Sequence, residues 1–183
     1  MAGRDALIPV AMLTVLLSIL PAAHASPGVP AGYRQVAQQA AVPASVLYAV
    51  ALTESGVRVK QSLKPWPWTL NVAGRSLRYA TRVDACHALR QFLHTVNPRR
   101  IDVGLGQLNL GWNGHYFRTP CDALDPYPNL HIAARLLRQR FERWQSWYEA
   151  VGRYHHPAGG RPARQYSRKV RHHLLALSSQ DPA

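Results

Sequence analysis

Residues 43–56 read PASVLYAVALTESG, and this stretch decides the fold. Pro43 suits the first turn of a helix, because the N–H that proline lacks has no helical partner there. No residue before Glu54 in this stretch carries a charge, so the helix would be apolar on every side and therefore buried. Gly56 fits the end of such a helix. The stretch predicts a buried central helix over residues 44–55.

The rest of the chain reads as further helices and one small hairpin. Apolar residues recur at helical spacing in most segments, whereas residues 69–79 read as two short strands around Ala73-Gly74. Thr81 can cap the helix that follows the hairpin. The expected helices cover residues 33–41, 44–55, 82–96, 129–144, 147–154 and 162–177. The fold class is therefore mainly α, an α+β arrangement with a helical domain and a minor β element.

The N-terminus has the three-part organisation of a secretory signal peptide. A polar start carrying Arg4 precedes an almost wholly apolar run from Ala6 to Leu20, and Ala23-His24-Ala25 follows as a cleavage signature. The alternative is an uncleaved membrane anchor, but the run is short for a span, which needs about 20 apolar residues. We expect removal of residues 1–25, leaving a single domain over residues 26–183 in the periplasm with no integral membrane segment.

Charge and cysteine content narrow the possible partners. The chain carries 22 Lys and Arg against 9 Asp and Glu, a net charge of +13, which favours an anionic partner. Export favours envelope polymers such as peptidoglycan over nucleic acid, for which no motif besides charge is present.

Cys86 and Cys121 are expected to form a disulfide in an oxidising compartment, the alternative being two buried free thiols. Neither CxxC nor HExxH spacing occurs, so the sequence predicts no metal site and no cofactor.

Glu54 is the best candidate for a catalytic group. It ends the apolar helix, where its carboxyl would be partly removed from water, and this favours the neutral form that donates a proton. A general acid for glycoside cleavage needs that property. Considered alone, Glu54 has a simple alternative, a solvent-facing glutamate at a helix end.

A glycine-rich segment, DVGLGQLN at residues 102–109, supplies the second group of candidates. Gly104 and Gly106 would let the backbone approach a bulky ligand such as a sugar chain. Gln107 and Asn109 carry amides that can bond to sugar hydroxyl or acetamido groups. The segment lacks the Lys-Ser/Thr of a phosphate-binding Walker loop and the GxGxxG order, whereas an ordinary turn remains an alternative.

Several segments resemble the signatures of lysozyme-like lytic transglycosylases of the SLT type, and they follow one another along the chain in the family's order. Those signatures are a Glu-Ser pair, a Gly-Leu-Met-Gln segment and an Ala-Tyr-Asn segment. The corresponding segments here are Glu54-Ser55, Gly104-Leu105-Gly106-Gln107 and Val151-Gly152-Arg153-Tyr154-His155, with family-like Asp125-Pro126-Tyr127-Pro128-Asn129-Leu130 and Tyr166-Ser167-Arg168-Lys169-Val170. The resemblance extends from about residue 33 to residue 177. It implies a lysozyme-like fold with the hairpin beside an active-site cleft.

Two residues depart from the family pattern. Gly106 stands where the family has Met, which removes an apolar contact to the sugar, and His155 stands where it has Asn, which changes a hydrogen-bonding side chain. We expect that neither change affects Glu54. The insert PWPWTLNV at residues 65–72 resembles members encoded with conjugative or secretion machinery, which implies conjugation or type IV secretion components as partners.

The resemblance also implies a reaction on peptidoglycan glycan strands. Glu54 would protonate the oxygen between N-acetylmuramic acid and N-acetylglucosamine, and then take the proton of the muramoyl C6 hydroxyl, which closes a 1,6-anhydro ring. Because the nucleophile belongs to the substrate, orientation supplies much of the barrier reduction. Ser55, Gln107 and Tyr154 are the positions implied to orient the sugar, with a core aromatic role as the alternative for Tyr154.

Two other functions remain open from the sequence. Residues 102–109 also resemble the lysozyme strand whose aspartate is the second catalytic carboxylate, so one alternative is a muramidase that uses Glu54 and Asp102. A turn aspartate bonded to nearby backbone is the structural alternative for Asp102. The positive charge also fits a non-catalytic basic protein that binds peptidoglycan or a scaffold, and such a protein would have no need of Glu54.

Overall fold

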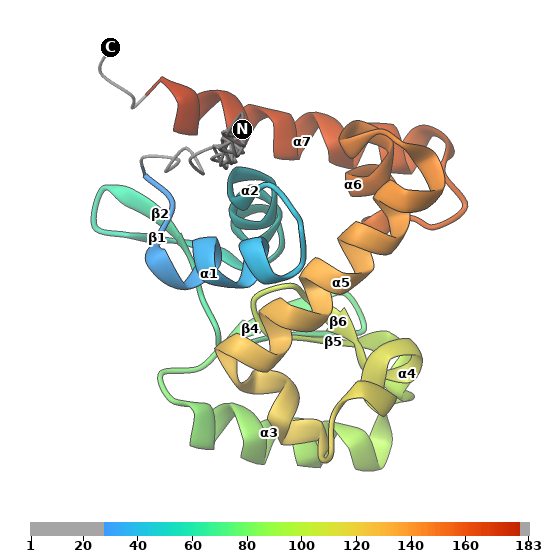
Figure 1. Cartoon of the computed structure of the whole chain (residues 1–183). Helices are drawn as coiled ribbons and strands as arrows, with labels where there is room; N and C mark the ends of the chain where they lie inside the picture. Colours follow the sequence, from blue (N-terminus) through green and yellow to red (C-terminus); the bar gives the residue numbers. More distant parts are fainter. Residues whose placement is uncertain (1–27, 180–183) are drawn as a thin grey trace, which may run out of the picture.

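The computed structural model describes residues 28–179, which fold mainly into helices with a small antiparallel sheet beside them (Figure 1). The fold class predicted from the sequence is confirmed. The helices are α1 (Ala31–Gln39), α2 (Ala44–Ser55), α3 (Arg82–Thr95), α4 (Leu110–Asn113), α5 (Pro126–Trp144), α6 (Trp147–His155) and α7 (Gly160–Ser178), with short 3-10 turns η1 (Pro98–Arg100), η2 (Gly114–Tyr116) and η3 (Pro120–Leu124). The strands are β1 (Gly56–Val59), β2 (Ser62–Pro65), β3 (Thr69–Val72), β4 (Arg75–Arg78), β5 (Ile101–Val103) and β6 (Leu108–Asn109).

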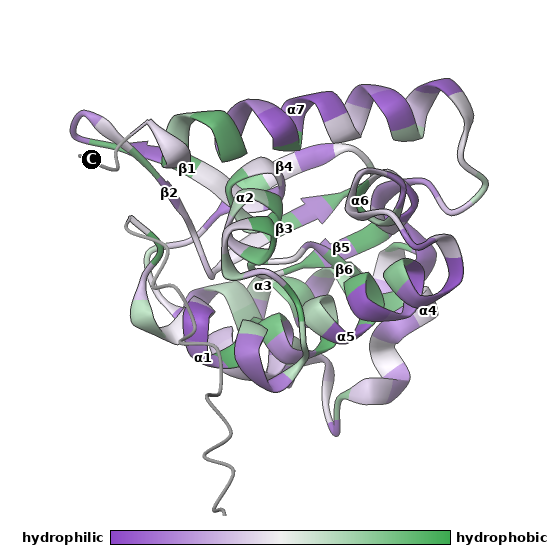
Figure 2. Ribbon diagram, turned by 45° about the horizontal axis from the view of Figure 1, so that its top comes forward, coloured by the Kyte–Doolittle hydropathy of each residue, from purple (hydrophilic) through white to green (hydrophobic). Residues whose placement is uncertain are grey.

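The helical cluster, formed by α1, α2, α5, α6 and α7, packs around α2. Every residue from Val46 to Leu52 is at most 8 % exposed, as the uncharged sequence of this helix predicts. Figure 2 shows α2 as largely hydrophobic beneath a mostly hydrophilic α7, whose buried side consists of Ala163, Tyr166, Ser167 and Val170. The core therefore places the C-terminal end of α2 directly against α7.

The sheet cluster consists of β3 to β6 with α3 and η3. Its strands follow the order β4-β3-β5-β6 and every neighbouring pair is antiparallel, with the expected hairpin forming β3 and β4. Leu70 and Val103 lie opposite each other and are fully buried in this cluster. Cys86 of α3 and Cys121 of η3 form a disulfide with Cα atoms 5.3 Å apart, which is the pairing expected from the sequence.

The hairpin of β1 and β2 was not predicted. Gly56, expected only to end α2, is also the first residue of β1 and pairs with Pro65. A Cβ on Gly56 would lie 2.2 Å from the carbonyl oxygen of Leu52, so glycine lets the chain turn directly from helix into strand. Each strand has only four residues and none of them is buried, so the hairpin gives a weak strand signal in the sequence.

The predicted helices are present, with ends that differ by a few residues. Thr81 caps α3 by accepting a hydrogen bond from the N–H of Asp84 at 3.1 Å. α5 begins at Pro126 rather than Asn129, because proline is well suited to the first helical turn. The predicted signal peptide, residues 1–25, lies outside the described residues.

In the part of the chain that the structure describes, no single helix has both the length and the apolar content of a membrane span. α1 and α2 meet those criteria only when joined, and they are bent by 117° relative to each other.

Asn129, in the first turn of α5, fixes the turn that follows β5. Its side chain is fully buried. Oδ1 accepts a hydrogen bond from the N–H of Gly106 at 2.8 Å, and Nδ2 donates to the carbonyl oxygens of Val103 at 2.9 Å and Ala123 at 2.8 Å. Gly104 has a φ of +81°, and a Cβ there would lie 2.4 Å from Asn129 Nδ2. The contact therefore requires glycine on one side and a short amide on the other.

We predict that Asn129→Ala lowers the free energy of unfolding by at least about 2 kcal/mol, because each buried backbone group left without a partner costs about 1–3 kcal/mol. Chemical denaturation followed by circular dichroism measures this. Gln38→Ala, on the exposed side of α1, serves as the matched amide control and should change stability by no more than about 0.5 kcal/mol. Equal stabilities of the two variants would show that the amide does not hold the turn.

Candidate active site

Glu54 lies in the last turn of α2, where two cavities meet. A cavity of about 720 Å³ opens on the side of the sheet, and another of about 590 Å³ opens toward α7. Glu54 and His155 line both cavities. The Glu54 side chain is 13 % exposed, so the apolar helix presents one largely shielded carboxyl group to a cleft large enough for a ligand.

The two oxygen atoms of the Glu54 carboxyl group have different surroundings. Tyr166 of α7 donates a hydrogen bond to Oε1 with an O···O distance of 2.7 Å. Across residues 28–179, no protein group donates a hydrogen bond to Oε2. Burial, together with the charge of Glu54, raises the pKa of Tyr166 well above its usual value, so the hydroxyl remains a donor. One carboxyl oxygen is thus held while the other is free to exchange a proton with a ligand.

Contrary to the expectation from the sequence, the change at His155 does reach Glu54, because the imidazole lies beside the same oxygen. Its Nδ1 lies 3.8 Å from Glu54 Oε1, and its ring stacks on Tyr166 with centroids 4.4 Å apart and planes 4° from parallel. Interaction with the Glu54 carboxylate raises the pKa of His155, while burial acts in the opposite direction. The family's neutral asparagine is therefore replaced here by a side chain that can place a positive charge next to the carboxylate.

The sheet side of the cleft carries a row of polar side chains, one from each strand. Asn71 of β3 lies opposite Ser76 of β4 and opposite Asp102 of β5, and Asp102 lies opposite Asn109 of β6. Directly opposed residues point to the same face of a sheet, and all four line the cavity that contains Glu54. The other face of β3, β4 and β5 carries the apolar residues that pack in the sheet cluster.

Asp102 and Asn109 act as a pair. Asn109 Nδ2 donates to Asp102 Oδ1 at 2.8 Å and to the carbonyl oxygen of Arg99 at 2.9 Å, and its Oδ1 caps α4. Burial raises the pKa of Asp102, the hydrogen bond from Asn109 lowers it, and the charge of Glu54 raises it. The Asn109 amide is thus committed to the protein and positions Asp102. In residues 28–179, no three His, Cys, Asp or Glu side chains gather in a way that could hold a metal ion.

The two glycines predicted to approach a ligand instead serve the interior. Gly104 faces Asn129 and does not line the cleft. A Cβ on Gly106 would lie 2.8 Å from the Tyr154 hydroxyl oxygen, so the Met of the family pattern has no room in this arrangement. The glycines therefore allow close packing of the turn against α5 and α6.

The other predicted residues divide between the turn and the cleft. Ser55 is fully buried and donates a hydrogen bond to the carbonyl oxygen of Leu105 at 2.9 Å, so it holds the turn. The resemblance implied that Ser55 orients the sugar, but its side chain is not exposed to the cleft. Tyr154 lines the cleft while its hydroxyl donates to the carbonyl oxygen of Gly106 at 2.6 Å. Gln107 also lines the cleft; its Nε2 donates to backbone carbonyls, which leaves Oε1 as an acceptor for a ligand.

Sequence reasoning missed several residues of the site. Tyr166 was recognised only as part of a family-like segment, although it holds the catalytic candidate. Asn71 and Ser76 are recognisable only from strand register, since their role depends on the row they form with β5. Trp112 is 63 % exposed and lines the sheet-side cavity, so its indole offers apolar surface to a ligand. The Arg99 guanidinium lies over the ring, 4.4 Å from its centroid, and covers one face of it.

Comparison with known proteins agrees with this geometry. Residues 33–174 match the Transglycosylase SLT domain family. Searches of curated proteins and of solved structures gave no significant match. The matched region includes Glu54, Asp102, Tyr154 and Tyr166 and therefore both walls of the cleft. Because the match covers more than half of the chain, the protein belongs to the SLT transglycosylase family, whose members are lytic transglycosylases that act on glycosidic bonds in peptidoglycan.

Proposed function

We propose that the protein cleaves the β-1,4 bond between N-acetylmuramic acid and N-acetylglucosamine and leaves a 1,6-anhydromuramoyl product. The observation that carries this proposal is the environment of Glu54, with Oε1 bonded to Tyr166 and Oε2 unbonded in the cleft. A single carboxyl group placed in this way suits a reaction in which the same residue first gives and then takes a proton.

The first step breaks the bond between muramoyl C1 and the glycosidic oxygen. Neutral Glu54 donates its proton from Oε2 to that oxygen, because Oε1 is held by Tyr166. N-acetylglucosamine leaves with the new hydroxyl group, and positive charge develops at C1 of the muramoyl unit. The Tyr166 hydroxyl and protonated His155 stabilise the carboxylate that Glu54 becomes.

The second step closes the ring. The Glu54 carboxylate takes the proton of the muramoyl C6 hydroxyl, and the C6 oxygen forms the new bond to C1. Glu54 returns to its neutral form, and no water is consumed. The cleft must therefore orient the C6 hydroxyl toward C1, which is the task of the polar residues on the sheet side.

Asp102 gives a specific reason to test a second candidate, a lysozyme-type muramidase. Such an enzyme uses two carboxyl groups that flank the scissile bond. Asp102 lines the same cavity as Glu54, and the charge of Glu54 contributes to the raised pKa of Asp102. In the transglycosylase reaction Asp102 is not required as a nucleophile, because the C6 hydroxyl has that role.

We predict that Glu54→Gln lowers digestion of purified sacculi by at least about 100-fold, the lower end of general acid–base contributions, because glutamine cannot donate and regain a proton. Asp102→Asn should retain measurable activity. Turbidity loss of sacculi and chromatography of released muropeptides measure both. Glu142→Gln makes the same change in an exposed ion pair and serves as the control. Normal digestion by Glu54→Gln would contradict the assignment, and an Asp102→Asn variant as inactive as Glu54→Gln would support the muramidase.

We also propose that the protein acts in the periplasm and opens the wall locally for a conjugation or secretion apparatus. The signal-peptide pattern supports export, and the resemblance of residues 65–72 supports the association with such machinery. N-terminal sequencing of the protein from the envelope fraction should begin at Ser26. A soluble cytoplasmic product that retains Met1 would contradict export.

A further inference from the structure

The cavity on the α7 side of Glu54 differs in charge from the cavity on the sheet side. Among residues 28–179, Glu54 is the only acidic residue that lines it, whereas Arg168 and Lys169 line it as permanent cations. Gln165 adds an amide. The sheet-side cavity instead combines neutral amides and hydroxyl groups with one carboxylate, Asp102, and one permanent cation, Arg140. Glu54 and His155 line both cavities. Apart from these two shared residues, a ligand that spans the cavities would meet one charge of each sign on the sheet side and two cations on the α7 side.

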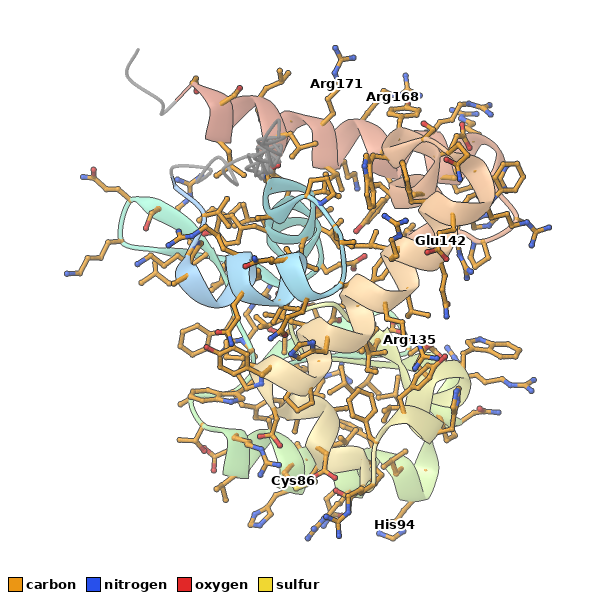
Figure 3. All side chains as sticks on the ribbon, in the orientation of Figure 1. Cys86, His94, Arg135, Glu142, Arg168 and Arg171 are labelled. Carbon is orange, nitrogen blue, oxygen red and sulfur yellow. A yellow bond between two sulfur atoms is a disulfide. The ribbon has the colours of Figure 1, made fainter. Side chains whose placement is uncertain are left out.

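Within residues 28–179, the two cations are not neutralised by another group. Neither Arg168 nor Lys169 forms an ion pair with any group in residues 28–179. The Lys169 charge acts to lower the pKa of His155, which lines the same cavity. Arg168 lines the outer edge and extends outward from α7 in Figure 3. An anionic group in this cavity would therefore gain two counterions without displacing an existing partner.

Peptidoglycan offers such an anion close to the bond that Glu54 attacks. The lactyl side chain of the muramoyl unit ends in a carboxylate when the stem peptide is absent, and otherwise leads to the acidic residues of that peptide. The muramoyl unit is one of the two sugars joined by the scissile bond, so its side chain lies within reach of a cavity that shares Glu54 with the rest of the cleft.

We propose that the α7-side cavity is an anion subsite in which Lys169 and Arg168 bind a carboxylate carried by the muramoyl side chain. This inference rests on the proposed function, because it needs Glu54 to mark the position of the scissile bond. Arg168 can bind a carboxylate through two parallel N–H groups, whereas Lys169 acts as a point charge near the sugar. The enzyme would thereby prefer acidic over amidated muropeptides.

The test measures binding in the Glu54→Gln background, where the probe is not consumed. Isothermal titration calorimetry compares a disaccharide-tetrapeptide with the same molecule whose carboxylates are amidated. The Arg168→Gln/Lys169→Gln double variant should bind the acidic probe about tenfold more weakly, as expected for two exposed ion pairs, and the amidated probe equally well. Arg171→Gln, on the same helix but not lining the cavity, should bind like its parent (Figure 3).

A third probe, the disaccharide with a free lactate, identifies the source of the carboxylate. Loss of affinity for this probe in the double variant assigns the lactyl carboxylate, and loss confined to the tetrapeptide assigns the stem peptide; both results support the subsite. Lys169→Gln alone repeats the comparison if the double variant unfolds at a lower temperature than its parent. Equal affinities of parent and variant for both the disaccharide-tetrapeptide and the disaccharide with a free lactate would overturn the proposal. Binding is measured without turnover, so this test can fail independently of the proposed reaction. Failure of the proposed reaction would instead appear as an absence of anhydro products from the wild-type protein.

Discussion

The buried side-chain amide of Asn129 is the contact on which the cleft depends. From the first turn of α5, this amide forms hydrogen bonds with backbone groups of two separate segments. One segment is the turn after β5, and the other is η3. Ser55 of α2 and Tyr154 of α6 bond to the same turn from the helical side. Since an unpaired buried polar group is costly, these bonds hold one backbone arrangement. The turn in this way fixes the sheet, with Asp102, relative to Glu54.

The electrostatic design of the site follows from the composition of α2. A helix without charge before Glu54 can be buried, and its last turn then delivers one carboxyl group to the cleft. Tyr166 and His155 surround one oxygen of that group, so the other oxygen faces the cleft without a hydrogen-bond donor from residues 28–179. The sheet supplies hydrogen-bonding groups, and α7 supplies positive charge. In the proposed mechanism, acid–base chemistry, sugar orientation and anion binding would therefore be carried by three different elements that meet at Glu54.

Much of the fold could be predicted because its signals are local. The uncharged run before Glu54, the cap at Thr81 and the helical spacing of α5 and α7 each specify an element from neighbouring residues. The hairpin of β1 and β2 was missed because each strand has only four residues and none of them is buried. Glu54 was predicted because it breaks an apolar run, whereas Tyr166 was missed because 112 positions separate it from Glu54. Gly104 was assigned to the ligand because a sequence cannot show whether a glycine makes room for a sugar or for a buried amide.

The central claim is that the substrate's own C6 hydroxyl, and not water, attacks C1 after Glu54 protonates the leaving oxygen. Digestion of purified sacculi by the wild-type protein in water enriched in heavy oxygen, followed by mass spectrometry of the muropeptides, tests this claim most directly. We predict 1,6-anhydromuramoyl products that carry no heavy oxygen, because ring closure consumes no water. Muramic acid with a labelled reducing end as the main product would contradict the account and assign hydrolysis instead.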